Sequence, residues 1–136
     1  MKIVLDTNVL ISALLNPEGI PAVLLSLIVN GKLKLLYDNR ILSEYFEVLN
    51  RKKFNFKSEW IEPLIDFIRN EGEFIIANPV FKSFKDKDDI KFYEVAKSGN
   101  AKYIITGNIN HFPKEDLIKT PAEFLNIYTR INKQNN

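Results

Sequence analysis

Short hydrophobic runs alternate along this chain with longer stretches in which hydrophobic residues recur every three or four positions. The short runs predict buried strands, and the longer stretches predict amphipathic helices. We expect strands at Lys2–Leu5, Leu33–Tyr37, Phe74–Ala77 and Tyr103–Thr106. We expect helices at Val9–Leu15, Pro21–Val29, Asn39–Asn50, Ser58–Arg69, Asp88–Ser98 and Pro121–Tyr128. Strands that alternate with helices favour a parallel sheet covered by helices on both faces.

Proline and glycine residues mark several of the expected helix ends. Pro21 suits the first position of its helix, which we expect to stop at Asn30-Gly31. Pro63 fits only in a first turn, so it leaves the start of the fourth helix open. Gly99 is expected to end the fifth helix in a left-handed conformation.

The composition is that of one folded domain. Of the 136 residues, 46% are hydrophobic and 26% are charged, which excludes a disordered chain. We expect a single domain over residues 1–131 and a frayed polar tail over 132–136. The net charge is only +2, so any basic surface must be local. No stretch resembles a signal peptide or a transmembrane helix, so a cytoplasmic protein is the expectation and no membrane partner is expected.

The chain has no cysteine and a single histidine, His111. Disulfides, cysteine-ligated zinc and thiol nucleophiles are therefore excluded, and carboxylates are the remaining chemical groups in quantity. Polar triplets, Asp6-Thr7-Asn8 and Thr106-Gly107-Asn108, directly follow two of the expected strands. Ligands of parallel sheets bind at these strand ends, although such triplets are also common as turns and helix caps.

Asp89 belongs to the hydrophobic side of its expected helix. At helical spacing it shares a face with Phe92 and Ala96. A buried acid is rare unless it is paired or binds a metal. The alternative is that Asp89 caps the helix, a role that Asp86 and Asp88 fit equally well.

Glu44 lies at the edge of the hydrophobic stripe of the third helix, beside Ile41 and Val48, from where it can reach a cleft. A solvated flanking glutamate is the alternative. Asp6, Glu44 and Asp89 could converge only around a cation, since like charges at close range repel. Oxygen ligands favour Mg²⁺ or Mn²⁺, and a metal-bound water can attack a phosphodiester.

Four blocks of the sequence resemble the PIN-domain nucleases, and more closely their toxin branch related to the VapC toxins. The blocks are Ile3-Val4-Leu5-Asp6-Thr7-Asn8-Val9-Leu10-Ile11-Ser12, Leu42-Ser43-Glu44 with Glu47-Val48-Leu49, Asp86-Lys87-Asp88-Asp89 with Lys91-Phe92, and Tyr103-Ile104-Ile105-Thr106-Gly107-Asn108. Pro121-Ala122-Glu123-Phe124-Leu125 resembles the closing helix of that branch. The resemblance implies a three-layer α/β/α fold with a mostly parallel sheet of four to five strands.

The resemblance also implies a function and a site. The family's activity is metal-dependent endoribonuclease cleavage, restrained in toxin members by a cognate antitoxin protein. Asp6, Asp89 and Glu44 are the implied ligands of Mg²⁺ or Mn²⁺, with Glu44 beside or between the metals. The implied catalytic set is these three acids together with Asn108. The residues expected to support them are Thr7, Asn8, Asp86, Asp88 and Thr106.

Asn108 departs from the family pattern. Many members carry an acid there, and others carry one three residues later, where this chain has His111. Asn108 can coordinate through its amide oxygen but adds no charge, so the sequence leaves open whether one or two metals bind. His111 is either a proton donor or an exposed loop residue.

Two other functions remain as alternatives. Asp6-Thr7-Asn8 invites comparison with haloacid-dehalogenase-type phosphatases, but Asn8 cannot deliver the proton that their second aspartate supplies. A degenerate nuclease fold could also bind RNA or a partner without cutting, which Asn108 favours and the three acids oppose. No Gly-x-Gly-x-x-Gly motif or Walker loop indicates nucleotide binding.

Two runs interleave basic and aromatic residues, Arg51-Lys52-Lys53-Phe54-Asn55-Phe56-Lys57 and Phe81-Lys82-Ser83-Phe84-Lys85. Such runs are typical of surfaces that hold single-stranded nucleic acid, so RNA-binding candidates are Arg51, Lys52, Lys53 and Lys85. Solvated lysines around core phenylalanines, or a surface covered by an antitoxin, are the alternatives. The sequence does not decide whether the chain forms a homodimer.

Overall fold

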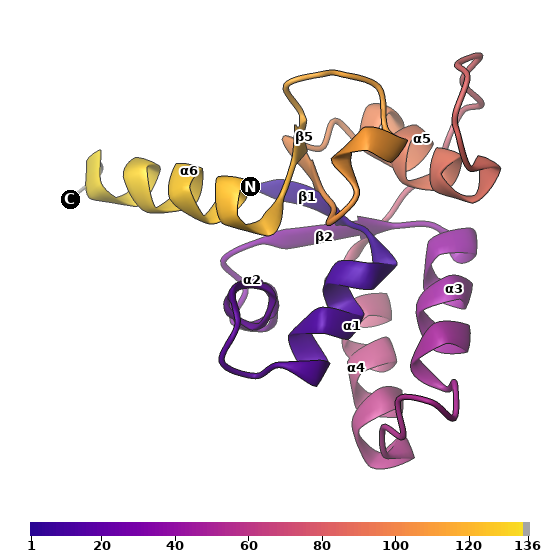
Figure 1. Ribbon diagram of the computed structural model, residues 1–136, viewed down its shortest axis with the longest axis vertical. Coiled ribbons are helices and arrows are strands. Elements are labelled where there is room, and N and C mark those ends of the chain that lie inside the picture. The colour runs from indigo at the N-terminus through magenta and orange to yellow at the C-terminus, as the bar shows by residue number, and fades with distance from the viewer. Residues whose placement is uncertain (135–136) are drawn as a thin grey trace.

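The structure is a computed structural model that describes residues 1–134 (Figure 1). Within this range the strands are β1 (Lys2–Leu5), β2 (Lys34–Tyr37), β3 (Glu73–Phe74), β4 (Tyr103–Ile105) and β5 (Ile118–Lys119). They form one sheet in the order β3-β2-β1-β4-β5, and every neighbouring pair is parallel. In the centre of the sheet, Ile3 pairs with Leu35 on one side and Tyr103 on the other.

Helices cover both faces of this sheet. They are α1 (Thr7–Leu15), α2 (Ile20–Val29), α3 (Asn39–Leu49), α4 (Ser58–Glu71), α5 (Ile90–Ser98) and α6 (Pro121–Gln134), with short 3-10 turns η1 (Lys87–Asp89) and η2 (Ile109–His111). In Figure 1, α1 to α4 lie on one side of the sheet and α5 on the other, while α6 extends sideways from the body. The prediction of a three-layer α/β/α fold with a parallel sheet is confirmed.

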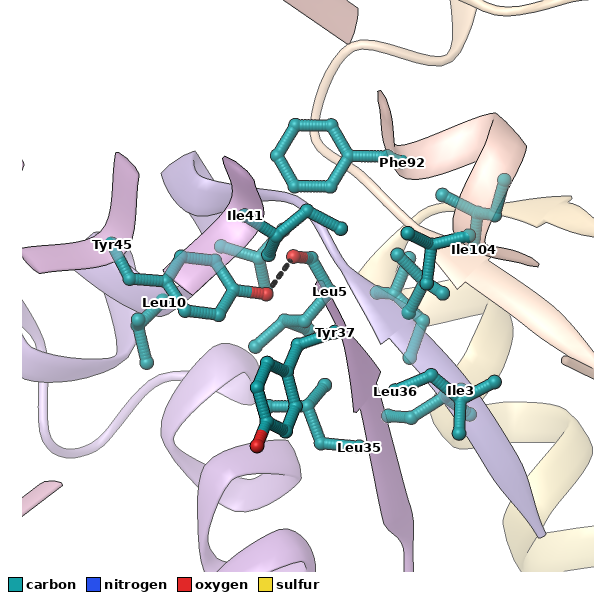
Figure 2. Close-up of a cluster of buried hydrophobic side chains, with 14 of the residues drawn as sticks. Ile3, Leu5, Leu10, Leu35, Leu36, Tyr37, Ile41, Tyr45, Phe92 and Ile104 are labelled. Atoms are coloured by element: carbon teal, nitrogen blue, oxygen red, sulfur yellow. Dashed lines mark hydrogen bonds between the residues drawn. The ribbon is translucent and has the colours of Figure 1, made fainter. Parts of the chain in front are cut away.

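The core surrounds the central strand. Ile3 and Val4 on β1 are fully buried, because helices pack on both faces of the sheet. Tyr45 is also fully buried, and its hydroxyl donates a hydrogen bond to the backbone carbonyl of Leu5 (Figure 2). This bond ties α3 to the end of β1, one residue before Asp6.

Several element boundaries differ from the prediction. β5 was not predicted, because it is only two residues long and its pattern carries no periodicity. β3 covers Glu73–Phe74 instead of Phe74–Ala77. α6 continues to Gln134, into the segment 132–136 expected to be a tail, and residues 135–136 lie outside the described range. Pro63 lies inside α4 rather than in its first turn. It is exposed, so water can satisfy the helix carbonyl that it leaves free.

The left-handed cap expected at Gly99 is one residue later. Gly99 has a φ of −93°, and Asn100 has the positive φ of 55°. Asparagine tolerates this conformation because its short polar side chain can bond locally. Gly99 is needed for space instead: a Cβ atom there would lie 2.7 Å from Leu36 Cδ1 and 2.8 Å from Ile75 Cδ1. The glycine thus lets α5 end directly against the sheet.

Residues 75–86, which we call the strap, run along α5 from β3 to η1. The strap is held by hydrogen bonds from Asn78 N to Ser98 Oγ and from Val80 N to Glu94 Oε2, both 2.9 Å long. Near its end it carries Asp86 into the neighbourhood of Asp89. The position of the Asp86 acid therefore depends on these contacts to α5.

Glu115, which precedes β5, also holds the strap against α5. Burial tends to raise the pKa of its carboxyl group, but hydrogen bonds from Tyr93, Lys97 and Lys82 outweigh burial and lower that pKa to about 2. Lys82 belongs to the strap, Tyr93 and Lys97 belong to α5, and Glu115 precedes β5. One carboxylate therefore joins three segments.

Candidate active site

An acidic cleft of about 460 Å³ opens at the carboxyl edge of the sheet. β1 and β4 are neighbours and parallel, so the residues that follow them meet at this edge. The cleft is lined by Asp6, Thr7, Asn8, Ile11, Ser12, Glu44, Val48, Arg51, Phe54, Asp86, Asp88, Asp89, Asn108 and His111. The structure thus brings together the acids of three segments that are far apart in the sequence.

Asp6 lines the cleft directly after the end of β1. Its residue is only 6% exposed, and its Oδ2 atom accepts a hydrogen bond of 2.7 Å from Thr106 Oγ1. The pKa of Asp6 is raised from 3.8 to about 6, chiefly by burial and further by the charges of Asp89 and Glu44. The hydrogen bond from Thr106 opposes this rise without cancelling it. A positive charge in the cleft would therefore stabilise the ionised form of Asp6.

Glu44 reaches the cleft from α3, and both of its carboxylate oxygens have partners. Oε2 accepts a hydrogen bond from the Thr7 hydroxyl, and Oε1 lies 2.8 Å from the Nζ atom of Lys91. The side chain of Lys91 is only 11% exposed. The alternative of a solvated Glu44 therefore does not describe this structure.

Asp89 does not cap its helix through its side chain. It is the residue before α5, but its carboxylate makes no capping hydrogen bond. Asp86 performs a cap instead, because its Oδ1 accepts a hydrogen bond of 2.9 Å from the backbone N–H of Asp88 at η1. The carboxylate of Asp89 is thus left available to the cleft.

The Oδ2 atom of Asp89 is buried and accepts no hydrogen bond from any residue in the range 1–134. His111 Nδ1 lies 3.3 Å away, which makes an ion pair only when the imidazole is protonated. Burial, followed by the charge of Asp86, raises the pKa of Asp89, while His111 and Lys91 lower it. His111 is therefore beside the acids and not remote from them, although its side chain is 44% exposed.

Of the residues expected to support the acids, some are buried beneath the cleft and others line it. Thr106 is fully buried beneath Asp6 and does not line the cleft; besides bonding Asp6, its Oγ1 accepts a hydrogen bond of 3.0 Å from the backbone N–H of Asn108. Asn8 and Asn108 line the cleft itself. The Oδ1 atom of Asn8 is buried without a hydrogen-bond partner in the described part of the chain.

The oxygen atoms of the cleft fit a hard cation. In the described residues, no group of three or more His, Asp or Glu side chains converges closely enough to form a ready-made metal site. Mg²⁺, however, commonly takes one or two carboxylates and keeps several waters. Asp6 and Asp89 would provide the carboxylates. The Oδ2 atom of Asp89, 3.3 Å from His111, and the Oδ1 atom of Asn8 are buried and accept no hydrogen bond in the described residues, which leaves them open to a cation or a water molecule. Asp6 and Asp89 are thus the residues that would hold such an ion.

A stability measurement distinguishes a metal ligand at position 89 from a structural residue. We expect Asp89→Ala to cost little in EDTA, because it removes one of several repelling charges. Saturating Mg²⁺ should stabilise the wild type by about 2.7 kcal/mol at a hundred times Kd, and the variant by much less. Denaturant melts in both conditions provide the test. An equal loss of ~0.5–2 kcal/mol in EDTA and in Mg²⁺ would show that Asp89 has a structural role and binds no ion.

Of the basic candidates, only Arg51 lines the acidic cleft, where it pairs with Glu47 at 3.0 Å. Lys52, Lys53 and Lys85 are exposed and do not line it. Sequence patterns alone could not tell these positions apart, because neighbouring residues on a loop point in different directions.

A second, basic cleft of about 460 Å³ adjoins the acidic one and shares Glu44 and Asp88 with it. Its basic residues are Arg40, Lys87 and Lys91, none of which was predicted to belong to the site. In the sequence, Lys87 and Lys91 stood only within the block that resembles the PIN-domain nucleases, and no role was assigned to either of them. The pairing of Lys91 with Glu44, on another helix, depends on the tertiary fold.

The all-parallel sheet with this cleft at its carboxyl edge is the architecture of a PIN-type α/β domain. The PIN domain pattern matches residues 2–110, and the chain belongs to the PIN-domain family. Members of that family are typically metal-dependent nucleases. Within residues 1–134 no single helix is long and apolar enough to cross a membrane; α1 and α2 pass that test only as a pair bent by 103°.

Two known proteins are similar to this chain. The uncharacterized protein MJ1680 of Methanocaldococcus jannaschii is 37% identical over 135 residues, which are 97% of this chain and 81% of that protein. The crystal structure of VapBC2 from Rickettsia felis, bound to a DNA fragment from their promoter, contains a chain with a TM-score of 0.54 and 17% identity. The match covers 88% of this chain and 97% of that chain, and at this identity it shows the fold alone.

Proposed function

We propose that this protein is a Mg²⁺- or Mn²⁺-dependent endoribonuclease that hydrolyses phosphodiester bonds of RNA. The observation that carries the proposal is that Asp6 and Asp89, from segments far apart in the sequence, line one cleft, where the buried Oδ2 atom of Asp89 accepts no hydrogen bond and has the half-exposed His111 3.3 Å away. A cleft that only bound RNA would have no reason to gather acids, because they repel the phosphate backbone.

Each residue has a distinct part in the proposed chemistry. Asp6 and Asp89 would hold the divalent ion, which would supply Lewis-acid chemistry: polarisation of the phosphate and activation of a water molecule. Thr106 orients Asp6 through its hydroxyl, which donates to Oδ2. Asn8 and Asn108 provide amide groups that can orient a water molecule or the substrate without adding charge.

The two adjoining clefts suggest how RNA would cross the site. Arg51 and Phe54 line the acidic cleft on one side, where a guanidinium can meet a phosphate and a ring can stack on a base. Arg40 and Lys87 line the basic cleft on the other side. A strand that spans both clefts would place one phosphate over Asp6 and Asp89.

We further propose that the protein acts in the cytoplasm as the toxin of a toxin–antitoxin pair, with a cognate antitoxin protein as its partner. The support is the fold shared with the VapBC2 structure. The second candidate function is a PIN-fold module that binds RNA without cutting it, which the uncharged Asn108 favours.

Cleavage of a labelled single-stranded RNA by the purified full chain tests the nuclease proposal. We expect cleavage with Mn²⁺ or Mg²⁺, none in EDTA, and a loss of at least about 100-fold in Asp89→Asn, because even outer partners of metal ligands contribute 10–100-fold. Asp66→Asn is the matched control, since Asp66 is exposed on α4, pairs with Arg69 and does not line the acidic cleft.

Three results would decide against the nuclease. Cleavage in EDTA, or equal cleavage by wild type and Asp89→Asn, would point to a contaminating enzyme. Metal-independent RNA binding without any cleavage would favour the inactive binding module.

A further inference from the structure

Lys91 is a buried lysine placed directly among the acids of the cleft. Its side chain is 11% exposed, and its ammonium group lies 2.8 Å from Glu44 Oε1. The same group donates a hydrogen bond to the backbone carbonyl of Asp88 and lies 5.0 Å from the centre of the Phe92 ring. A buried ammonium is costly unless it is paired, so these contacts fix its position.

The contacts of Lys91 change the role available to Glu44. One Glu44 oxygen faces Lys91 and the other accepts a hydrogen bond from Thr7. Asp89, in contrast, keeps a buried oxygen with no hydrogen-bond partner in residues 1–134. The three acids are therefore not equivalent: Glu44 is paired with a buried lysine, whereas Asp89 faces the half-exposed His111 at 3.3 Å and Asp6 accepts a hydrogen bond from the uncharged hydroxyl of Thr106.

We propose that Lys91 is a built-in cation of this cleft, which withdraws Glu44 from metal binding so that the cleft takes up one divalent ion and not two. The inference deepens the proposed function, because it assumes the metal site at Asp6 and Asp89. Asn108 acts in the same direction, since it brings no charge that could help to hold a second ion. Glu44 is then the residue that positions Lys91.

Calorimetric titration of the full chain with Mn²⁺ alone tests this assignment without any cleavage assay. The wild type should bind one ion. Lys91→Met keeps the length of the side chain but frees Glu44, so it should bind a second ion, or the first about tenfold or more tightly. Lys32→Met is the matched control, because Lys32 is exposed, lines neither cleft and should not change the titration.

A second variant guards against a loss of folding in Lys91→Met. The double change Lys91→Met with Glu44→Gln removes both charges of the pair, and should bind one Mn²⁺ ion with the wild-type affinity. Two ions bound by the wild type would overturn the proposal, as would unchanged binding in Lys91→Met or lost binding in the double variant.

The outcomes also separate this proposal from the proposed function. A wild type that binds one Mn²⁺ ion, with the expected response to Lys91→Met, but cuts no RNA would refute the nuclease and leave the role of Lys91 standing. A wild type that cuts RNA with two bound ions would do the opposite. No Mn²⁺ binding at all would overturn both.

Discussion

Replacing Asp6 by asparagine is expected to raise the free energy of unfolding of the metal-free protein by about 3 kcal/mol at pH 7. The pKa of Asp6 rises from 3.8 to about 6 on folding, and each unit corresponds to about 1.36 kcal/mol. The cost arises because a buried charge faces Asp89 and Glu44. Asparagine keeps an oxygen that can accept the hydrogen bond from Thr106, so the substitution removes the charge and keeps the contact.

The pH dependence of this effect has a definite sign. Between about pH 4 and pH 6 the folded protein holds a proton on Asp6 that the unfolded chain has lost, so the wild-type stability falls as the pH rises through this window. Below about pH 4 both states are protonated and the advantage of Asp6→Asn disappears. Denaturant melts in EDTA at pH 4 and pH 7 measure the difference, and a constant gap between the two proteins would contradict the assignment.

The same substitution should abolish the proposed activity. Asp6→Asn removes one of the two carboxylates that would hold the divalent ion, so Mg²⁺ should no longer stabilise the protein and RNA should remain uncut. A variant that is more stable and yet inactive would separate loss of function from loss of folding. Asp66→Asn serves again as the control, and cleavage by Asp6→Asn at the wild-type rate would refute the role of Asp6.

Arg40→Met is expected to lower the free energy of unfolding by about 2–3 kcal/mol, because it leaves buried acids without their counter-charge. Arg40 lies 2.7 Å from Glu94 Oε1 and 2.8 Å from Asp38 Oδ2, and both acids are 7% exposed. Glu94 also accepts a hydrogen bond from Val80 in the strap, and Asp38 caps α3 by accepting one from Ile41. The substitution should therefore destabilise the strap as well as the start of α3.

Thermal or denaturant melts at pH 7 measure this loss. Arg69→Met is the matched control: its pair with Asp66 is exposed on both sides, so it should cost less than about 1 kcal/mol. Adding Glu94→Gln to Arg40→Met should recover part of the stability. Equal small losses in Arg40→Met and Arg69→Met would show that the buried acids find other partners.

Sequence patterns predicted much of this architecture, for a physical reason. Strands buried on both faces must be hydrophobic throughout, and the helices that cover them must show one hydrophobic side, so β1, β2, β4 and most helices were recognisable. The acids were recognisable as well, because a carboxylate that follows a buried strand or faces a hydrophobic row is unusual. Their metal-binding and catalytic roles remain predictions.

What the sequence could not provide depends on contacts between distant segments. β5 is a strand only because β4 lies beside it. Gly99 was expected to adopt a left-handed conformation. Instead, its lack of a side chain leaves room for Leu36 of β2 and Ile75 of the strap, which lie far from it in the sequence. In the same way, no local pattern distinguishes Lys91, which is paired with Glu44, from the exposed Lys52 and Lys53.

The place of β1 in the middle of the sheet has a consequence for a chain still emerging from the ribosome. β2 can pair with β1 early, but the other edge of β1 has no neighbour until β4 is made. The hydrogen bond to Asp6 cannot form until Thr106, 100 positions later, has been added to the chain. Closing so long a loop is slow and costs entropy before any contact repays it. A partly synthesised chain therefore has neither its central strand nor its acidic cleft complete. If the chain does cut RNA, the translation machinery that produces it is not exposed to a working nuclease until nearly the whole domain has been made.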